Sequence, residues 1–167
     1  VSYVTGGAGQ AVRTTDNSDV SVPASASLVA TRAMTIEFWA RAQSTLTGGR
    51  AGLVDNNGNY GIFVYPGNAV TCSVGGTSVS APSALLAAEW THIACIYDGT
   101  SLRLYRNGAV VGSVPQTGGT PTGASAGLRI GHDNPTGSPF DGAIDGLRIW
   151  RVARPTGLLC TQSANCG

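Results

Sequence analysis

The chain has 167 residues, of which 42% are hydrophobic and only 11% are charged, and its net charge is +1. A chain of this length fits one domain and leaves little room for two. Its apolar content is enough for one core, which argues against intrinsic disorder. All ten basic residues are arginine and none lies in a basic run, which argues against a nucleic-acid-binding protein. No apolar stretch approaches roughly 18 residues, so the sequence predicts no membrane span.

Apolar and polar residues alternate with a period of two along most of the chain, which predicts strands and no long helix. Tight turns at Asp98-Gly99 and Asn107-Gly108 join three consecutive antiparallel strands within residues 96–111. A short Ala/Leu patch after Pro82 predicts one helical turn. The strands expected from alternation cover residues 34–41, 60–65, 70–74, 91–97, 127–131 and 143–152. Many short strands with frequent turns predict an all-β sandwich or barrel.

The chain contains four cysteines and no C-x-x-C spacing, and these residues are Cys72, Cys95, Cys160 and Cys166. An even count of this kind favours two disulfides, and therefore secretion, over a zinc site. If the strands around Cys72 and Cys95 are antiparallel neighbours, Val74 lies opposite Ile93 on the same face, and the register suits a Cys72–Cys95 bond. A Cys160–Cys166 bond would pin the tail, residues 155–167. The alternative is four free thiols in a cytosolic protein.

Six segments carry a family resemblance by their order and spacing. They are TIEFW at 35–39, EWTHIA at 89–94, YDG at 97–99, LRLYRNG at 102–108, RIG at 129–131 and FDGAIDGLRIW at 140–150. Together they resemble the laminin-G-like and pentraxin branch of the concanavalin A-like lectin/glucanase superfamily, over about residues 12–155. The resemblance implies a single jelly-roll domain, residues 1–167, made of two antiparallel sheets and secreted. It also implies glycan binding, protein adhesion, or a companion module of a secreted enzyme.

Calcium is the cofactor that the loops suggest, because hard cations need several oxygen ligands. The resemblance to pentraxins places the loops 55–59 and 132–134 at calcium-binding positions, with Asn59 and Asp133 as matching ligands. Asp55 and Asn134 are the further candidate ligands of this site. Pro135 stands where another acid is expected, so the predicted affinity is weak or absent. The alternative is that these residues satisfy turn backbone through side-chain hydrogen bonds.

A second candidate calcium site is structural and would join the two ends of the chain. Asp16, Asn17 and Asp19 lie near the N-terminus, and Asp145 or Asp141 lies near the C-terminus. The terminal strands of a jelly roll can lie side by side, so one ion could hold these carboxylates together. The same turn-forming alternative applies here.

Sugar recognition requires an aromatic face beside polar groups that hold hydroxyls. Tyr60 and Tyr65 follow the Asn-rich loop, and together with Asn57 and His132 they are the predicted ligand-binding residues, with Tyr60 expected to be exposed. Trp39 shares a strand face with Glu37 and Arg41 and fits the same requirement. Aromatic residues are only 7% of the chain, however, so we expect the three tryptophans, Trp39, Trp90 and Trp150, in the core.

The sequence offers little for catalysis. Retaining glycosidases need two carboxylates about 5 Å apart, whereas the two glutamates, Glu37 and Glu89, are far apart in the sequence. The G-x-S-x-G match at residues 123–127 lacks the strand and helix that a nucleophile elbow needs. His132 with a nearby acid is the remaining hydrolase or lyase hypothesis. We therefore expect a secreted, non-catalytic, calcium-assisted module that binds a glycan or an extracellular protein. The alternative is a protein-binding or structural accessory domain of a larger secreted protein or enzyme.

Overall fold

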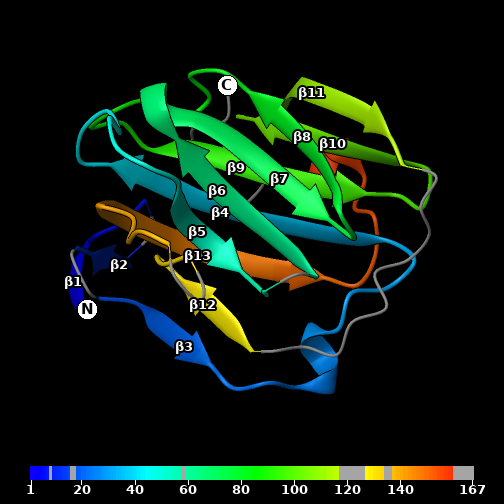
Figure 1. Ribbon diagram of the computed structural model, residues 1–167, viewed down its shortest axis with the longest axis horizontal. Coiled ribbons are helices and arrows are strands. Elements are labelled where there is room, and N and C mark those ends of the chain that lie inside the picture. Colours follow the sequence, from blue (N-terminus) through cyan, green and yellow to red (C-terminus); the bar gives the residue numbers. More distant parts are fainter. Residues whose placement is uncertain (8, 16–17, 58, 117–126, 134–136, 160–167) are drawn as a thin grey trace.

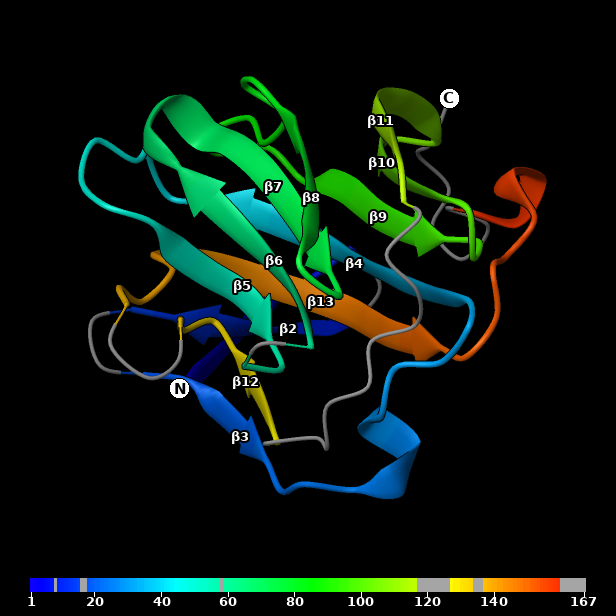
Figure 2. The ribbon, with the colours of Figure 1, turned by 45° about the vertical axis from the view of Figure 1, so that its right-hand side comes forward.

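The protein is an antiparallel β-sandwich in a computed structural model, which describes residues 1–7, 9–15, 18–57, 59–116, 127–133 and 137–159. Two sheets lie face to face, and Figure 1 and Figure 2 show them as separate layers. The described residues contain only short 3-10 turns as helical structure. None of these turns has the length and apolarity that a bilayer crossing requires. The predicted all-β sandwich is therefore confirmed.

The larger sheet has seven strands, and the first and last parts of the chain meet in it. Its order is β1 (Ser2–Thr5), β2 (Gln10–Thr14), β13 (Gly142–Trp150), β4 (Met34–Ala42), β9 (Thr91–Tyr97), β10 (Ser101–Arg106) and β11 (Ala109–Pro115). The N-terminal strand β2 pairs with the last strand β13, so the ends of the domain lie side by side.

The smaller sheet has six strands. Its order is β3 (Val20–Val22), β12 (Leu128–Ile130), β5 (Ala51–Asp55), β6 (Tyr60–Tyr65), β7 (Ala69–Val74) and β8 (Thr77–Ala81). The core lies between the two sheets, because alternate residues of facing strands point inward. Ile36 and Phe38 of β4 and Ile62 and Val64 of β6 are examples, and all four are buried in one apolar cluster.

The structure also departs from the predicted elements. The alternation missed β5, because its five residues include no polar one before Asp55 and so give no alternation to detect. The predicted helical turn in the Ala/Leu patch is wrong. Ser83 and Ala88 have positive φ angles of 48° and 61°, which a right-handed helical turn does not allow. Ala84 and Leu85 are instead buried side chains of an irregular turn segment.

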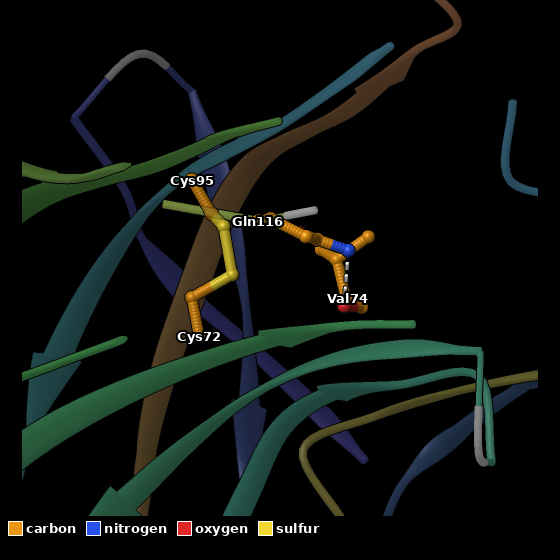
Figure 3. The surroundings of a disulfide bond; sticks show 4 residues. All are labelled: Cys72, Val74, Cys95 and Gln116. Atoms are coloured by element: carbon orange, nitrogen blue, oxygen red, sulfur yellow. Dashed lines mark hydrogen bonds between the residues drawn. A yellow bond between two sulfur atoms is a disulfide. The ribbon is translucent and has the colours of Figure 1, made fainter. Parts of the chain in front are cut away.

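A disulfide joins Cys72 and Cys95, whose Cα atoms are 6.2 Å apart. The two residues were paired correctly, but the predicted strand neighbourhood is wrong. Cys72 lies on β7 of the smaller sheet and Cys95 on β9 of the larger sheet, so the bond crosses the core (Figure 3). Val74 pairs with Tyr60 and Thr77, not with Ile93. In the smaller sheet β7 pairs with β6 and β8, whereas in the larger sheet β9 pairs with β4 and β10. The predicted Cys160–Cys166 bond lies outside the described residues.

Candidate functional site

The predicted loop site is divided by strand β5. Asp55 ends β5, whereas His132 and Asp133 lie beside Gly52, where a Cβ atom would be 2.4 Å from the backbone N of Asp133. Gly52 and Asp55 are three residues apart on β5, which is about 10 Å along a strand. The structure therefore does not bring the two loops together at one end of the strand.

Asp133 already has a cationic partner. Its side chain is buried, and its two oxygens accept hydrogen bonds from Arg50, at 2.5 Å from Nε and 2.8 Å from Nη2. The hydrogen bond with Asp133 raises the pKa of Arg50, so this arginine stays charged. Among the described residues, no three His, Cys, Asp or Glu side chains are grouped as metal ligands. Calcium at Asp55, Asn59 and Asp133 stays a prediction, and Asn134 lies outside the described residues.

The predicted sugar-binding residues have different environments. Tyr60 is only 3% exposed, and its hydroxyl donates a hydrogen bond to the backbone oxygen of Leu28 at 2.9 Å. Burial raises the pKa of Tyr60 to about 12. The prediction of an exposed Tyr60 is wrong, because this residue lies on the inward face of β6 with Ile62 and Val64.

The other three predicted ligand-binding residues are at least partly accessible. Asn57 is exposed, and Tyr65 is 36% exposed at the far end of β6. His132 is half-buried, with Nδ1 2.6 Å from the backbone oxygen of Asp133. Tyr65 lies five residues from Tyr60 and interacts with Arg50. These side chains therefore do not form one aromatic platform beside the Asn-rich loop.

The carboxylates proposed for the second calcium site also have protein partners. Asp19 accepts a hydrogen bond from Arg129 at 2.7 Å, and Asp145 accepts one from the backbone N–H of Gly7 at 3.0 Å. Asp16 and Asn17 lie outside the described residues. The ends of the chain are joined by an ion pair between Arg13 of β2 and Asp141, at 2.7 Å. A calcium ion at this place stays a prediction.

The tryptophans lie outside the core, contrary to the prediction. Trp39 and Trp90 are half-buried, and Trp150 is 38% exposed. On β4, Ile36 and Phe38 point into the core, so Glu37, Trp39 and Arg41 share the outward face of the larger sheet. Buried tyrosines take up part of the core volume that the prediction gave to tryptophan, and they are Tyr60 and Tyr97.

Trp39 is the centre of this outward face. Its ring makes an edge contact with His92 of β9, with the ring centroids 5.2 Å apart. On the other side of β4, Asp145 of β13 is the cross-strand neighbour of Trp39. Next to Asp145, Gly146 has a φ of +60° in the bulge of β13, and a Cβ there would be 3.9 Å from Cδ1 of Trp39. Because residue 146 is a glycine, it places no side chain over the Trp39 ring.

Two arginines stack on the other tryptophans. The guanidinium of Arg41 lies 5.1 Å from the centre of the Trp90 ring, and that of Arg154 lies 4.6 Å from Trp150. Within the described residues, Arg41 makes no ion pair, so its N–H groups can serve a ligand. Such cation–π contacts hold a flexible guanidinium in place.

Glu37 is the buried carboxylate of the same face. The indole N–H of Trp150 donates to its Oε1 at 3.0 Å, Arg154 forms an ion pair with it, and Nε2 of His92 lies 3.6 Å from Oε2. Burial alone would raise the pKa of Glu37, but the interactions with His92, Trp150 and Arg154 lower it below its ordinary value. Glu37 is therefore ionised at neutral pH and neutralised by Arg154.

The segment that follows β13 covers one end of the outward face. Thr35 donates a hydrogen bond to the backbone oxygen of Val152 at 2.9 Å and accepts one from the backbone N–H of Arg154 at 3.0 Å. Leu159 packs in a small cluster with Ala94, Ile96 and Tyr105. As far as Leu159, this segment covers the end of β4 that holds Thr35 and Glu37, and none of its described residues covers the end that holds Trp39 and Arg41.

Comparison with known proteins gives the family. The sequence profile of the concanavalin A-like lectin/glucanases superfamily matches residues 13–156. The chain belongs to this family. The predicted resemblance is thus confirmed, and the laminin-G-like jelly roll accounts for the two sheets described above.

Two solved structures share the fold of this superfamily member. Domain 4 of AbnA, a GH43 extracellular arabinanase from Geobacillus stearothermophilus, superposes with a TM-score of 0.74 at 23% identity, over 94% of this chain and 78% of that chain. The CBM40 of Ruminococcus gnavus IT-sialidase superposes with a TM-score of 0.69 at 15% identity, over 89% of this chain and 95% of that chain.

One curated protein is similar in sequence. Mouse (Mus musculus) pappalysin-1 is 33% identical over 81 residues, which is 47% of this chain and 5% of that protein. The chain thus matches only a small part of pappalysin-1.

Proposed function

We propose that this domain is a secreted, non-catalytic glycan-binding module whose ligand lies on the open end of the outward face, around Trp39. The observation that carries the proposal is the half-buried Trp39 ring, which shares the outward face with Arg41. The neighbouring residue Gly146 has no side chain that could cover this ring. Two proteins of the same fold support it, since the AbnA domain was solved with arabinotriose and the CBM40 with α2,3-sialyllactose.

The chemistry of this face suits a sugar. An indole ring offers a flat apolar surface with polarised edges, on which the C–H groups of a sugar ring can stack. The guanidinium of Arg41, held by Trp90, supplies donors for hydroxyl oxygens at the edge of that surface. Asp145 is the cross-strand neighbour of Trp39 on β13, and its Oδ2 accepts a hydrogen bond from the backbone N–H of Gly7.

The state of Glu37 supports a non-catalytic role. A general acid must hold a proton at neutral pH, which requires a raised pKa, whereas the pKa of Glu37 is lowered. Its two oxygens are directed to Arg154, Trp150 and His92, which leaves it little capacity to act on a substrate. A disulfide across the core favours an oxidising, extracellular location.

The test is a glycan array followed by calorimetric titration of the best ligand. We expect Trp39→Ala to weaken binding at least tenfold, which corresponds to about 1.4 kcal/mol. Tyr3→Ala is the matched control, because Tyr3 is an exposed aromatic residue (65%) on the edge strand β1 of the same sheet. Through Val12 it is in register with the inward-facing Ile144, so Tyr3 lies on the face of the sheet opposite to Trp39.

Equal affinities of the two variants would contradict the proposal, as would a wild-type protein that binds no glycan and captures a protein partner instead. Repeating the titration in excess chelator tests the calcium prediction separately. Loss of affinity on chelation supports calcium assistance, and an unchanged affinity contradicts it.

A further inference from the structure

A cavity of about 210 Å³ lies at the end of the sandwich, next to loop 43–49 and close to the open end of the outward face. Its floor consists of apolar side chains from both sheets and from the segment before β13, namely Ala42, Ala51, Val64 and Phe140. The volume is smaller than the roughly 300–1,000 Å³ of pockets for drug-sized ligands. It therefore suits a single small ring.

Asn68 provides a fixed donor on the wall of this cavity. The residue is only 3% exposed, and its Oδ1 accepts a hydrogen bond from the backbone N–H of Leu46 at 2.8 Å. Because a backbone N–H can only donate, this contact fixes which side of the amide is oxygen. The Nδ2 group has no partner in the described chain and is not sealed from solvent. A buried amide thus leaves two N–H donors for an occupant.

Acceptors and hydroxyl groups complete the polar part of the cavity. Ser44, Thr45 and Thr47 contribute hydroxyl side chains from the loop, and Asp141 contributes a carboxylate. Asp141 is neutralised by its ion pair with Arg13, so the cavity has no net charge to satisfy. Donors and acceptors around an apolar floor match a neutral polyhydroxylated ring better than an anion or a hydrocarbon.

The cavity lies near the outward face. Asp141 lines the cavity and forms an ion pair with Arg13. Ala143 of β13 has Arg13 of β2 as its neighbour on one side and Arg41 of β4 on the other, and Arg41 is two residues from Trp39. The small side chain of Ala143 separates the two arginines on that face. A ligand that fills the cavity can therefore extend past Asp141 toward Trp39.

We propose that this cavity is a terminal subsite that binds the end ring of a neutral glycan, while the following rings lie on Trp39. The proposal rests on the proposed function for the class of ligand, but it assigns a separate place and separate residues. It predicts that the domain recognises glycan ends and not only internal segments.

The test uses Gly48, which lines the cavity and has no atom within 4 Å of a Cβ placed on it. Gly48→Leu should narrow the cavity without disturbing the fold. Gly49→Leu is the matched control, since Gly49 has equally open surroundings but does not line the cavity. The probes are methyl glycosides of neutral pentoses and hexoses, titrated into ¹⁵N-labelled protein, and the linear oligosaccharide that the glycan array selects.

We expect the methyl glycoside that binds to shift the Asn68 side-chain amide signals. Gly48→Leu should weaken the binding of this glycoside at least tenfold, whereas Gly49→Leu should leave it unchanged. Asn68→Asp keeps the acceptor for the N–H of Leu46 but loses both donors, so it should weaken glycoside binding similarly, with thermal melting as a check on folding.

If Gly48→Leu binds every probe as the wild type does, the terminal subsite is overturned while binding at Trp39 stands. If no neutral methyl glycoside shifts Asn68, the subsite is likewise overturned. If Trp39→Ala alone leaves the oligosaccharide affinity unchanged, the proposed function fails and not the subsite.

Discussion

At the scale of single residues, Glu37 and Trp39 show what strand alternation can and cannot predict. They are two positions apart on β4 and share its outward face, yet Glu37 is 2% exposed whereas Trp39 is half-buried. The period-two pattern predicted the shared face. It could not predict the difference in burial, because Glu37 is covered by Arg154, which lies 117 residues away in the sequence.

Asp98 is the residue for which the structure predicts a pH effect. Its carboxylate accepts hydrogen bonds from the backbone N–H groups of Thr100 and Ser101, at 2.9 and 2.8 Å, and pairs with Arg103. Burial alone would raise the pKa of Asp98, but the hydrogen bonds from Thr100 and Ser101 lower it well below its ordinary value. This contribution to stability is therefore complete above about pH 4, the unfolded-state value, and is lost as the pH falls further.

Asp98→Asn should lower the free energy of unfolding at pH 7 by about 1–2 kcal/mol, because hydrogen bonds to a charged acceptor become weaker. The difference from wild type, measured by urea denaturation, should shrink as the pH falls below about 4. Asp141→Asn is the control, since its carboxylate is 54% exposed and pairs at the surface. A stability difference that is constant with pH would contradict the role of the ionised carboxylate.

At the scale of elements, three of the longer strands were predicted well. Thr91–Tyr97 and Tyr60–Tyr65 have the predicted bounds, and β4 extends one residue beyond its prediction. The short strands β1, β2 and β3 were not predicted, since three to five residues give too few alternations to identify a period. The sheet to which each strand belongs also depends on long-range pairing, and for this reason the disulfide was assigned to neighbouring strands.

The disulfide should stabilise the sandwich by linking the two sheets. Replacing both cysteines, Cys72→Ala with Cys95→Ala, should lower the free energy of unfolding by about 3 kcal/mol, because a loop of this length gains entropy in the unfolded chain. Guanidinium denaturation of the double variant measures the loss, and reduction of the wild-type protein should reproduce it. Glycan affinity should stay the same below the unfolding transition, since Trp39 lies on the opposite face of the sheet from Cys95. Unchanged stability would contradict an intact bond in the wild-type protein.

At the scale of the whole molecule, the family and the sandwich were predictable, but the place of the candidate site was not. The sequence identified aromatic residues and acidic loops. It could not show that Arg50 neutralises Asp133. It also could not show that Asp133 lies beside Gly52 of β5, three residues from Asp55. Nor could it show that the described part of the segment after β13 covers Thr35 and Glu37 but not Trp39. Each of these facts depends on contacts between residues far apart in the sequence.

The central claim is that a glycan lies on the Trp39 end of the outward face, and the three tryptophan indole N–H signals test it directly. A ¹⁵N-labelled sample is titrated with the oligosaccharide that the glycan array selects, and the signals are assigned with single Trp→Phe variants. We predict a saturable shift of the Trp39 signal and little change at Trp150, whose indole N–H is held by Glu37. A glycan that binds while the Trp39 signal stays in place would contradict the account.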